Sequence, residues 1–315
     1  MKKTVLCLCG PTATGKSQIA YELAIKYRTE IISADSRTIY KEISIGTAKP
    51  TKEMLSAVPH HFIDILSITE RYDSGTFGRE ARNLIQRIFQ DKDLVIIAGG
   101  STLYIHSLMY GFDEIPPSSP NLRNHLLELY NREGITKLQE MLKELDFDYW
   151  QSVDKKNPHR LIRALEVIIS SGEKYSSLRK AFWERPLLFK DHNVLMIAIH
   201  YEKATLKERI LNRLKGMVKD GLLEEVCSLL PYSHCYPLQT FVYREFFSYL
   251  RGEISFEKAF ELAALNTYRY AIRQKKWFKN YRELLWINGE SSVPPLQQIE
   301  ALLERQIKQC GKTDY

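Results

Sequence analysis

Short apolar runs alternate with helix-periodic segments in the N-terminal third of the chain. Residues 5–9, 30–35 and 94–98 have the length and apolar character of buried strands. Between them, residues 17–27 and 75–89 repeat apolar side chains at the spacing of one helical face. Strand–helix–strand order at this spacing predicts a parallel sheet with helices on both faces, an α/β fold. Ligands are then expected beyond the carboxyl ends of the strands.

The middle of the chain loses this alternation. A Pro- and Ser-rich stretch at 116–120 is followed by a helical pattern, and a strand pattern returns only at 192–199. We therefore expect an all-helical insertion, 114–190, within a P-loop NTPase-like core made of 1–113 and 191–315. The rest of the core is expected to form helices at 204–219, 222–230, 238–250 and 256–279, a strand at 284–287 and one more short helix.

Composition narrows the class of protein. Hydrophobic residues make up 44% and charged residues 26%, which excludes wholesale disorder, a collagen and a disulfide scaffold. The net charge of +7 permits a polyanionic partner. Five cysteines without a CxxC spacing favour a reducing compartment. The first apolar run is too short for a signal peptide, and no stretch is long enough to span a bilayer, so we expect a cytoplasmic protein without a membrane partner.

The turn after the first strand carries a phosphate-loop motif. The pattern G-x-x-x-x-G-K-[ST] lies between an apolar strand and an amphipathic helix. Its backbone N–H groups and the helix N-terminus would bind phosphate oxygens. Lys16 would add a positive charge, and the Ser17 hydroxyl would hold Mg²⁺ as cofactor. The motif consists of Gly10, Pro11, Thr12, Ala13, Thr14, Gly15, Lys16 and Ser17.

A carboxylate is expected close to this loop. NTPases place an acidic metal ligand at the end of a later strand, but the strand at 94–98 ends in Gly-Gly-Ser-Thr. The strongest candidate is Asp35, at the carboxyl end of the second strand, where it could act as a general base. The alternative for Asp35 is a turn or capping role.

Together these motifs resemble the tRNA dimethylallyltransferase family. The two most specific segments are Ser-Ala-Asp-Ser at 33–36 and Gly-Thr-Ala-Lys-Pro at 46–50. The resemblance implies that dimethylallyl diphosphate occupies the phosphate loop. It also implies transfer of the prenyl group to N6 of the adenosine 3′ to the tRNA anticodon, position 37. Further matches follow in order at 58–64, 98–104, 160–167, 221–226 and 269–274.

The resemblance also assigns roles to single residues. Negative charge accumulates on diphosphate as it leaves, so Lys16, Arg213, the loop N–H groups and Mg²⁺ at Ser17 would stabilise it. Asp35 would accept the proton of the adenine amine, and Ser101 would hydrogen-bond near that amine. The alternative for Arg213 is a solvated helix face.

A tRNA partner fits the charge distribution of the last third of the chain. Residues 266–282 hold six Lys or Arg and no acid, and Arg269, Arg273 and Lys276 share one helical face. Aromatic residues are interleaved with them; alternatively, these aromatics are core and the cations a solvated face. The target base must leave its stack to react. Other residues that the resemblance implies for tRNA contact are Asp35, Ser36, Arg37, Thr38, Ser101, Arg123, His159, Arg160, Leu161, Ile162 and Arg163.

The chain departs from the family pattern without losing a reactive group. Thr38 stands for a usual Gln, Ser101 for Thr, Val242 for Gly and Ile272 for Lys. Three other readings of the phosphate loop stay open: a small-molecule or nucleotide kinase, a free-adenylate prenyltransferase, and a non-catalytic RNA-binding switch. We expect a monomer.

Overall fold

The chain forms two compact units, each described here by itself. The structure is a computed structural model that describes residues 2–112, 120–178 and 183–310. One unit comprises Met1–Tyr110 with Leu187–Tyr315, and the other comprises Gly111–Pro186. The expected insertion boundary at residue 114 lies outside the described residues, as does most of the Pro- and Ser-rich stretch. The other expected boundary, 190, falls a few residues after the end of the second unit.

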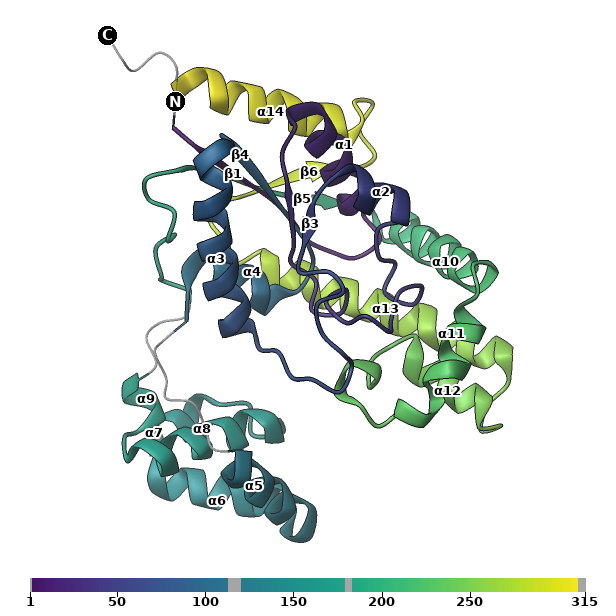
Figure 1. Ribbon diagram of the computed structural model, residues 1–315. Helices are drawn as coiled ribbons and strands as arrows, with labels where there is room; N and C mark the ends of the chain where they lie inside the picture. Colours follow the sequence, from purple (N-terminus) through teal and green to yellow (C-terminus); the bar gives the residue numbers. More distant parts are fainter. Residues whose placement is uncertain (1, 113–119, 179–182, 311–315) are drawn as a thin grey trace. The chain divides into compact units, whose positions relative to one another are not determined.

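A six-stranded parallel sheet forms the centre of the larger unit (Figure 1). Its strand order is β3-β2-β4-β1-β5-β6, so the first strand of the chain lies inside the sheet. This confirms the predicted α/β class with a parallel sheet. The strands are β1 (Thr4–Cys9), β2 (Ile31–Ser33), β3 (His60–His61), β4 (Leu94–Ala98), β5 (Asn193–His200) and β6 (Leu284–Asn288).

Helices follow the strands along the chain and cover the sheet. In the larger unit they are α1 (Lys16–Tyr27), α2 (Lys52–Ala57), α3 (Ser74–Asp91), α4 (Thr102–Tyr110), α10 (Lys203–Lys219), α11 (Leu222–Leu229), α12 (Tyr243–Leu250), α13 (Phe256–Phe278) and α14 (Pro295–Cys310), with short 3-10 turns η1 (Leu230–Tyr232) and η2 (Tyr236–Leu238). No helix in the described part of the chain is both long and apolar enough to cross a membrane.

Successive side chains of β1 point into two different cores, as a strand requires. Val5 and Cys7 belong to a cluster with apolar residues of α3 and α4 on one face of the sheet. Leu6 and Leu8 belong to a second cluster with residues of α1 and α14 on the other face. The two clusters explain why the apolar runs of the strands are nearly continuous, since both faces are buried.

A third core lies in the C-terminal part of the larger unit. Helices α10 to α13 pack around it together with Ile39, Tyr40 and Ile43, which come from the long segment after β2. Tyr243 and Phe246 of α12 are fully buried in it. This core attaches the C-terminal helices to the segment that follows β2, and thereby places them beside the phosphate loop.

Some elements differ from the sequence-based expectation. The helix expected at 238–250 begins only at Tyr243, because Val242 has φ 76° and ψ −66°, outside the helical region. The last helix, α14, is longer than expected. The short elements α2 and β3 and the helix α4 were not predicted.

The smaller unit is helical, with a core of its own. Leu138 and Leu142 pack against Leu161 and Leu165 inside it. Asn157 caps the first turn of its central helix by accepting a hydrogen bond from the backbone N–H of Arg160. Its helices are α5 (Pro120–Glu133), α6 (Ile135–Leu145), α7 (Phe147–Ser152), α8 (Pro158–Ser171) and α9 (Tyr175–Leu178).

Candidate active site

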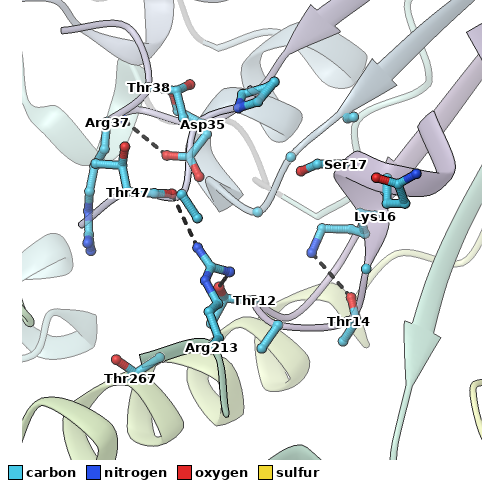
Figure 2. A pocket seen from close by; sticks show the side chains of 18 of the residues that line it. Thr12, Thr14, Lys16, Ser17, Asp35, Arg37, Thr38, Thr47, Arg213 and Thr267 are labelled. Carbon is cyan, nitrogen blue, oxygen red and sulfur yellow. Dashed lines mark hydrogen bonds between the residues drawn. The ribbon is translucent and has the colours of Figure 1, made fainter. Parts of the chain in front are cut away.

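A cavity of about 530 Å³ lies at the carboxyl ends of β1, β2 and β4, where a parallel sheet is expected to bind ligands (Figure 2). The turn after β1 is the phosphate loop, the turn after β2 carries Asp35, and β4 ends in Gly99 and Gly100. Helices α10 and α13 complete its wall. All of its lining residues belong to the larger unit.

The phosphate loop turns through three residues with positive φ. Gly10, Ala13 and Gly15 have φ values of 111°, 63° and 89°. A Cβ on Gly10 would lie 3.0 Å from the Cβ of Ala198 on the neighbouring strand, so glycine serves both the turn and the close approach. The loop thus takes the curled shape that the motif predicts.

Lys16 is buried within this loop. Its Nζ donates to the carbonyl of Pro11 and lies 3.4 Å from Oγ1 of Thr14. Burial is the main cause that lowers the pKa of Lys16 to about 8; the nearby charge of Arg213 acts in the same direction, while Cys9 and Asp35 act against it. A buried ammonium group whose only hydrogen-bond acceptors are neutral would be stabilised strongly by an anion in the cavity.

Two residues from the C-terminal helices hold the phosphate loop in place. Gln274 accepts a hydrogen bond from the N–H of Thr12 (2.9 Å) and donates one to the carbonyl of Gly100 (2.7 Å). Arg209 donates from Nε to the carbonyl of Ala13 (2.8 Å). Neither residue is among those that the sequence predicted for the site.

Arg213 reaches from α10 into the cavity (Figure 2). One guanidinium nitrogen donates to Oγ1 of Thr12 (3.1 Å) and the other to the carbonyl of Thr47 (3.2 Å). Burial lowers the pKa of Arg213, and the negative charge of Asp35 opposes this change. Arg213 is therefore a cavity residue and not part of a solvated helix face.

Asp35 lines the same cavity, and its carboxylate also shapes the turn after β2. Its Oδ1 accepts a hydrogen bond from the N–H of Arg37 (3.0 Å), which is the turn role considered as an alternative. The strand ends of β2 and β4 approach closely here, because a Cβ on Gly99 would come within 2.1 Å of the carbonyl oxygen of Ala34. Asp35 thus has both a turn role and a place at the cavity wall.

Ser101 is not among the residues that line the cavity. The cavity is lined by Gly99 and Gly100 on this side. Ser101 is buried, and its hydroxyl accepts from the N–H of Ser36 (2.8 Å) and donates to the Ser36 hydroxyl (3.0 Å). The hydroxyl expected near a reacting group therefore holds the turn that carries Asp35.

Arg37 and Thr38, which follow Ser36 in this turn, are also held in place by contacts. The guanidinium of Arg37 stacks 3.9 Å above the ring of Phe241 and lies 5.7 Å from the ring centroid of Tyr270. Thr38 is buried, with its hydroxyl 3.0 Å from that of Ser33. Both residues line the cavity.

A half-buried carboxylate holds the segment that carries Thr47. Glu225 of α11 accepts hydrogen bonds from the N–H groups of Ser44 (2.9 Å), Ile45 (2.7 Å) and Gly46 (2.9 Å). The Tyr243 hydroxyl donates to the same carboxylate (2.7 Å). This arrangement presents the carbonyl of Thr47 to Arg213, and the sequence analysis did not anticipate it.

The cations and the aromatic rings of this basic segment differ in their exposure to solvent. Arg269, Arg273 and Lys276 are exposed. Phe278 and Tyr281 are buried in the core against the sheet. The interleaved aromatics are thus mainly core, as the alternative reading held, while the three cations remain open to solvent.

In the smaller unit the expected tRNA contacts fall into two groups. His159 and Arg160 are exposed on the first turn of α8, whereas Leu161 and Ile162 are fully buried in the helical core. Apolar packing occupies the side chains of Leu161 and Ile162, and the tRNA contact expected at these two residues stays a prediction.

Two arginines of the smaller unit share one carboxylate. Arg123 and Arg163 lie 3.2 and 3.7 Å from the carboxylate oxygens of Glu166. Glu166 has no exposed side-chain surface, while both arginines are about one third exposed, at 34% and 36%. The buried acid thus fixes the two guanidinium groups and leaves part of each at the surface.

Comparison with known proteins gives consistent matches. The family model of IPP transferases matches residues 38–281. The chain is 36% identical to "tRNA dimethylallyltransferase 1" of Bacteroides thetaiotaomicron, over 94% of this chain and 95% of that protein. A solved tRNA isopentenylpyrophosphate transferase of Bacillus halodurans has 30% identity and a TM-score of 0.71, covering 99% of both chains. A eukaryotic dimethylallyltransferase structure with 24% identity and a TM-score of 0.83 shares the fold; it covers 98% of this chain and 80% of that one.

Proposed function

The chain belongs to the IPP transferase family, and we propose that its central cavity transfers a dimethylallyl group from dimethylallyl diphosphate to N6 of the adenosine at position 37 of tRNAs. One observation carries this proposal. A phosphate loop, a half-buried arginine and a carboxylate line one cavity, and they supply what a diphosphate leaving group and a proton-losing acceptor require.

The phosphate-loop side of the cavity suits the leaving group. The allylic carbon of dimethylallyl diphosphate tolerates cation-like character, so negative charge builds on the diphosphate as the bond breaks. Lys16 and Arg213 carry positive charge at this place, and the N-terminus of α1 adds its dipole. These groups would stabilise the departing diphosphate more than the bound substrate.

The Asp35 side suits the acceptor. The N6 amine of adenine is a weak nucleophile because its lone pair is delocalised, and the alkylated amine must lose a proton. Asp35 would accept that proton as a general base, held by the Arg37 N–H and by the turn that Ser101 fixes. The adenosine would enter the cavity extruded from its loop.

Mg²⁺ is proposed as the cofactor, bound with the diphosphate. The described residues hold no group of three His, Cys, Asp or Glu side chains arranged for a metal. Mg²⁺ is commonly bound by one or two protein oxygens together with substrate phosphates. Ser17, on the first turn of α1 and on the cavity wall, would supply the protein oxygen, and the ion would neutralise charge on the phosphates.

The tRNA is proposed to contact the exposed cations of α13 and of the smaller unit. No acidic residue lies close in sequence to Arg269, Arg273 and Lys276 that could neutralise their charge. His159 and Arg160 would contribute from the smaller unit, together with the exposed parts of Arg123 and Arg163. We propose a monomer that acts on tRNA in the cytoplasm.

A direct test distinguishes this function from the kinase, free-adenylate and RNA-switch alternatives. The protein is incubated with labelled dimethylallyl diphosphate or labelled ATP, and with AMP or bulk tRNA as acceptor. Label from dimethylallyl diphosphate should appear in tRNA at an adenosine 3′ to the anticodon. Transfer to AMP, phosphoryl transfer from ATP, or tRNA binding without any transfer would each reject the proposal.

Replacing Lys16 with alanine should impair transfer strongly while leaving tRNA affinity nearly unchanged. Lys16 lies in the phosphate loop, far along the chain from the exposed cations, and removal of one charge-stabilising donor typically costs ~10²–10³-fold in rate. Transfer rates and tRNA affinity are measured on the same preparation. An equal loss of tRNA affinity would contradict the assignment of Lys16 to the leaving group.

The lowered pKa of Lys16 predicts a pH dependence of diphosphate binding. Its pKa of about 8 means that the ammonium form is lost as the pH rises through this value. Affinity for inorganic diphosphate should therefore fall above pH 8, although diphosphate itself gains negative charge there. Lys16→Arg keeps its charge and should not show this fall, so equal pH profiles for both proteins would contradict the prediction.

A further inference from the structure

Val242 has a backbone conformation that branched side chains rarely adopt. Its φ is 76° and its ψ is −66°. Among the non-glycine residues with positive φ in the described ranges, it is the one with a β-branched side chain. Such a conformation is a genuine outlier for valine, and it persists only where the surroundings enforce it.

Contacts on both sides of Val242 hold its backbone in this conformation. Its N–H donates to a carboxylate oxygen of Glu245 (2.7 Å), and its carbonyl accepts from the N–H of Phe246 (3.2 Å). The preceding residue, Phe241, stacks against Arg37, and the following residue, Tyr243, is fully buried beside Gly46. The backbone is thus held from both sides, and glycine would satisfy the same geometry without strain.

The side chain of Val242 forms part of an apolar wall of the cavity. It is only 3% exposed, and it belongs to the same hydrophobic cluster as Leu214 and Met217 of α10, which also line the cavity. Arg213, which precedes Leu214 in sequence, contacts Thr12 of the phosphate loop, and all three residues line the cavity. An apolar chain attached to a diphosphate in this loop would run along that wall.

We propose that Val242 limits the length of the prenyl chain that the cavity accepts, by filling with its side chain a space that glycine would leave open. This inference rests on the proposed function, since it concerns the donor of that reaction. A valine held in a conformation that is strained for a branched side chain is explained if the side chain itself is needed. One methylene group in an apolar pocket is typically worth ~10–200-fold in discrimination.

The test compares a five-carbon and a ten-carbon donor. Dimethylallyl diphosphate and geranyl diphosphate are supplied to wild type, Val242→Ala and Val242→Gly with the same tRNA, and kcat/KM is measured for each. The geranyl-to-dimethylallyl ratio should rise by roughly tenfold in Val242→Gly, and by less in Val242→Ala, which keeps its Cβ.

Val226 provides a matched control. It is fully buried in the same cluster, on α11, and does not line the cavity. Its alanine and glycine variants should leave the donor ratio unchanged. Melting temperatures add a readout independent of activity: at helical Val226 the glycine variant should melt below the alanine variant, whereas at Val242 this order should reverse because glycine releases the strain.

The possible outcomes separate this inference from the proposed function. If wild type does not transfer the dimethylallyl group, the proposed function fails, and the inference fails with it. If wild type is active and the donor ratio of both Val242 variants equals that of wild type, the inference alone is overturned. If Val242→Gly does not fold, Val242→Ala serves as the second variant. A raised geranyl-to-dimethylallyl ratio in either Val242 variant, without such a rise in the Val226 variants, supports the inference.

Discussion

Asp35→Asn should lower the rate of prenyl transfer by ~10²–10⁴-fold, the usual loss when a general base is removed. The fold should survive, because the side-chain oxygen of asparagine can still accept the hydrogen bond from the Arg37 N–H. Affinity for tRNA should change little, since the exposed cations are untouched. Single-turnover rates with enzyme in excess over tRNA measure the chemical step directly.

A control variant at a second aspartate shows whether the expected loss is specific to Asp35. Asp220→Asn removes the same charge at an exposed position after α10, away from the cavity. It should transfer the prenyl group at the wild-type rate. Near-normal turnover by Asp35→Asn would contradict the assignment of Asp35 as the base. Its carboxylate would then serve only the turn after β2.

The parts of the fold that the sequence predicted are those determined by local pattern. Apolar runs at β1, β4 and β5 are buried on both faces, so their hydrophobicity is continuous and easily recognised. The strand β3 consists of His60 and His61 alone and pairs only with β2, so no periodicity could reveal it. The early end of the helix expected at 238–250 depends on the conformation of Val242, which tertiary contacts impose.

The residues of the candidate site also divide into those that a local sequence pattern predicts and those that long-range contacts determine. The phosphate loop is a local motif, and Asp35 follows from the position of a strand end. Gln274 is different, because its partner Thr12 is 262 residues away and no spacing in the sequence links them. Glu225 and the segment 44–46 form a similar long-range contact. The side chains of Leu161 and Ile162 pack inward, although both residues belong to a segment for which the resemblance implies tRNA contact.

Changing Arg269, Arg273 and Lys276 together to glutamate should weaken tRNA binding strongly and reduce its dependence on salt. All three side chains are exposed on α13, so each can reach a phosphate. Each phosphate contact that is lost lowers the slope of log K against log salt by ~0.7–0.9, so three contacts change it by roughly two to three. The affinity is measured at several salt concentrations with bulk tRNA.

Two controls show whether this loss reflects tRNA contact at α13 itself. Affinity for inorganic diphosphate should be unchanged, because none of the three residues lines the cavity. Arg79, Arg87 and Arg305 are also exposed and lie outside the cavity, so their reversal to glutamate changes the net charge equally. The second triple variant should lose less affinity and keep its salt slope, because a general charge effect lacks direct phosphate contacts. If both triple variants behave alike, the cations of α13 are a solvated face, and the tRNA path must instead be sought around Arg160 and Arg163 of the smaller unit.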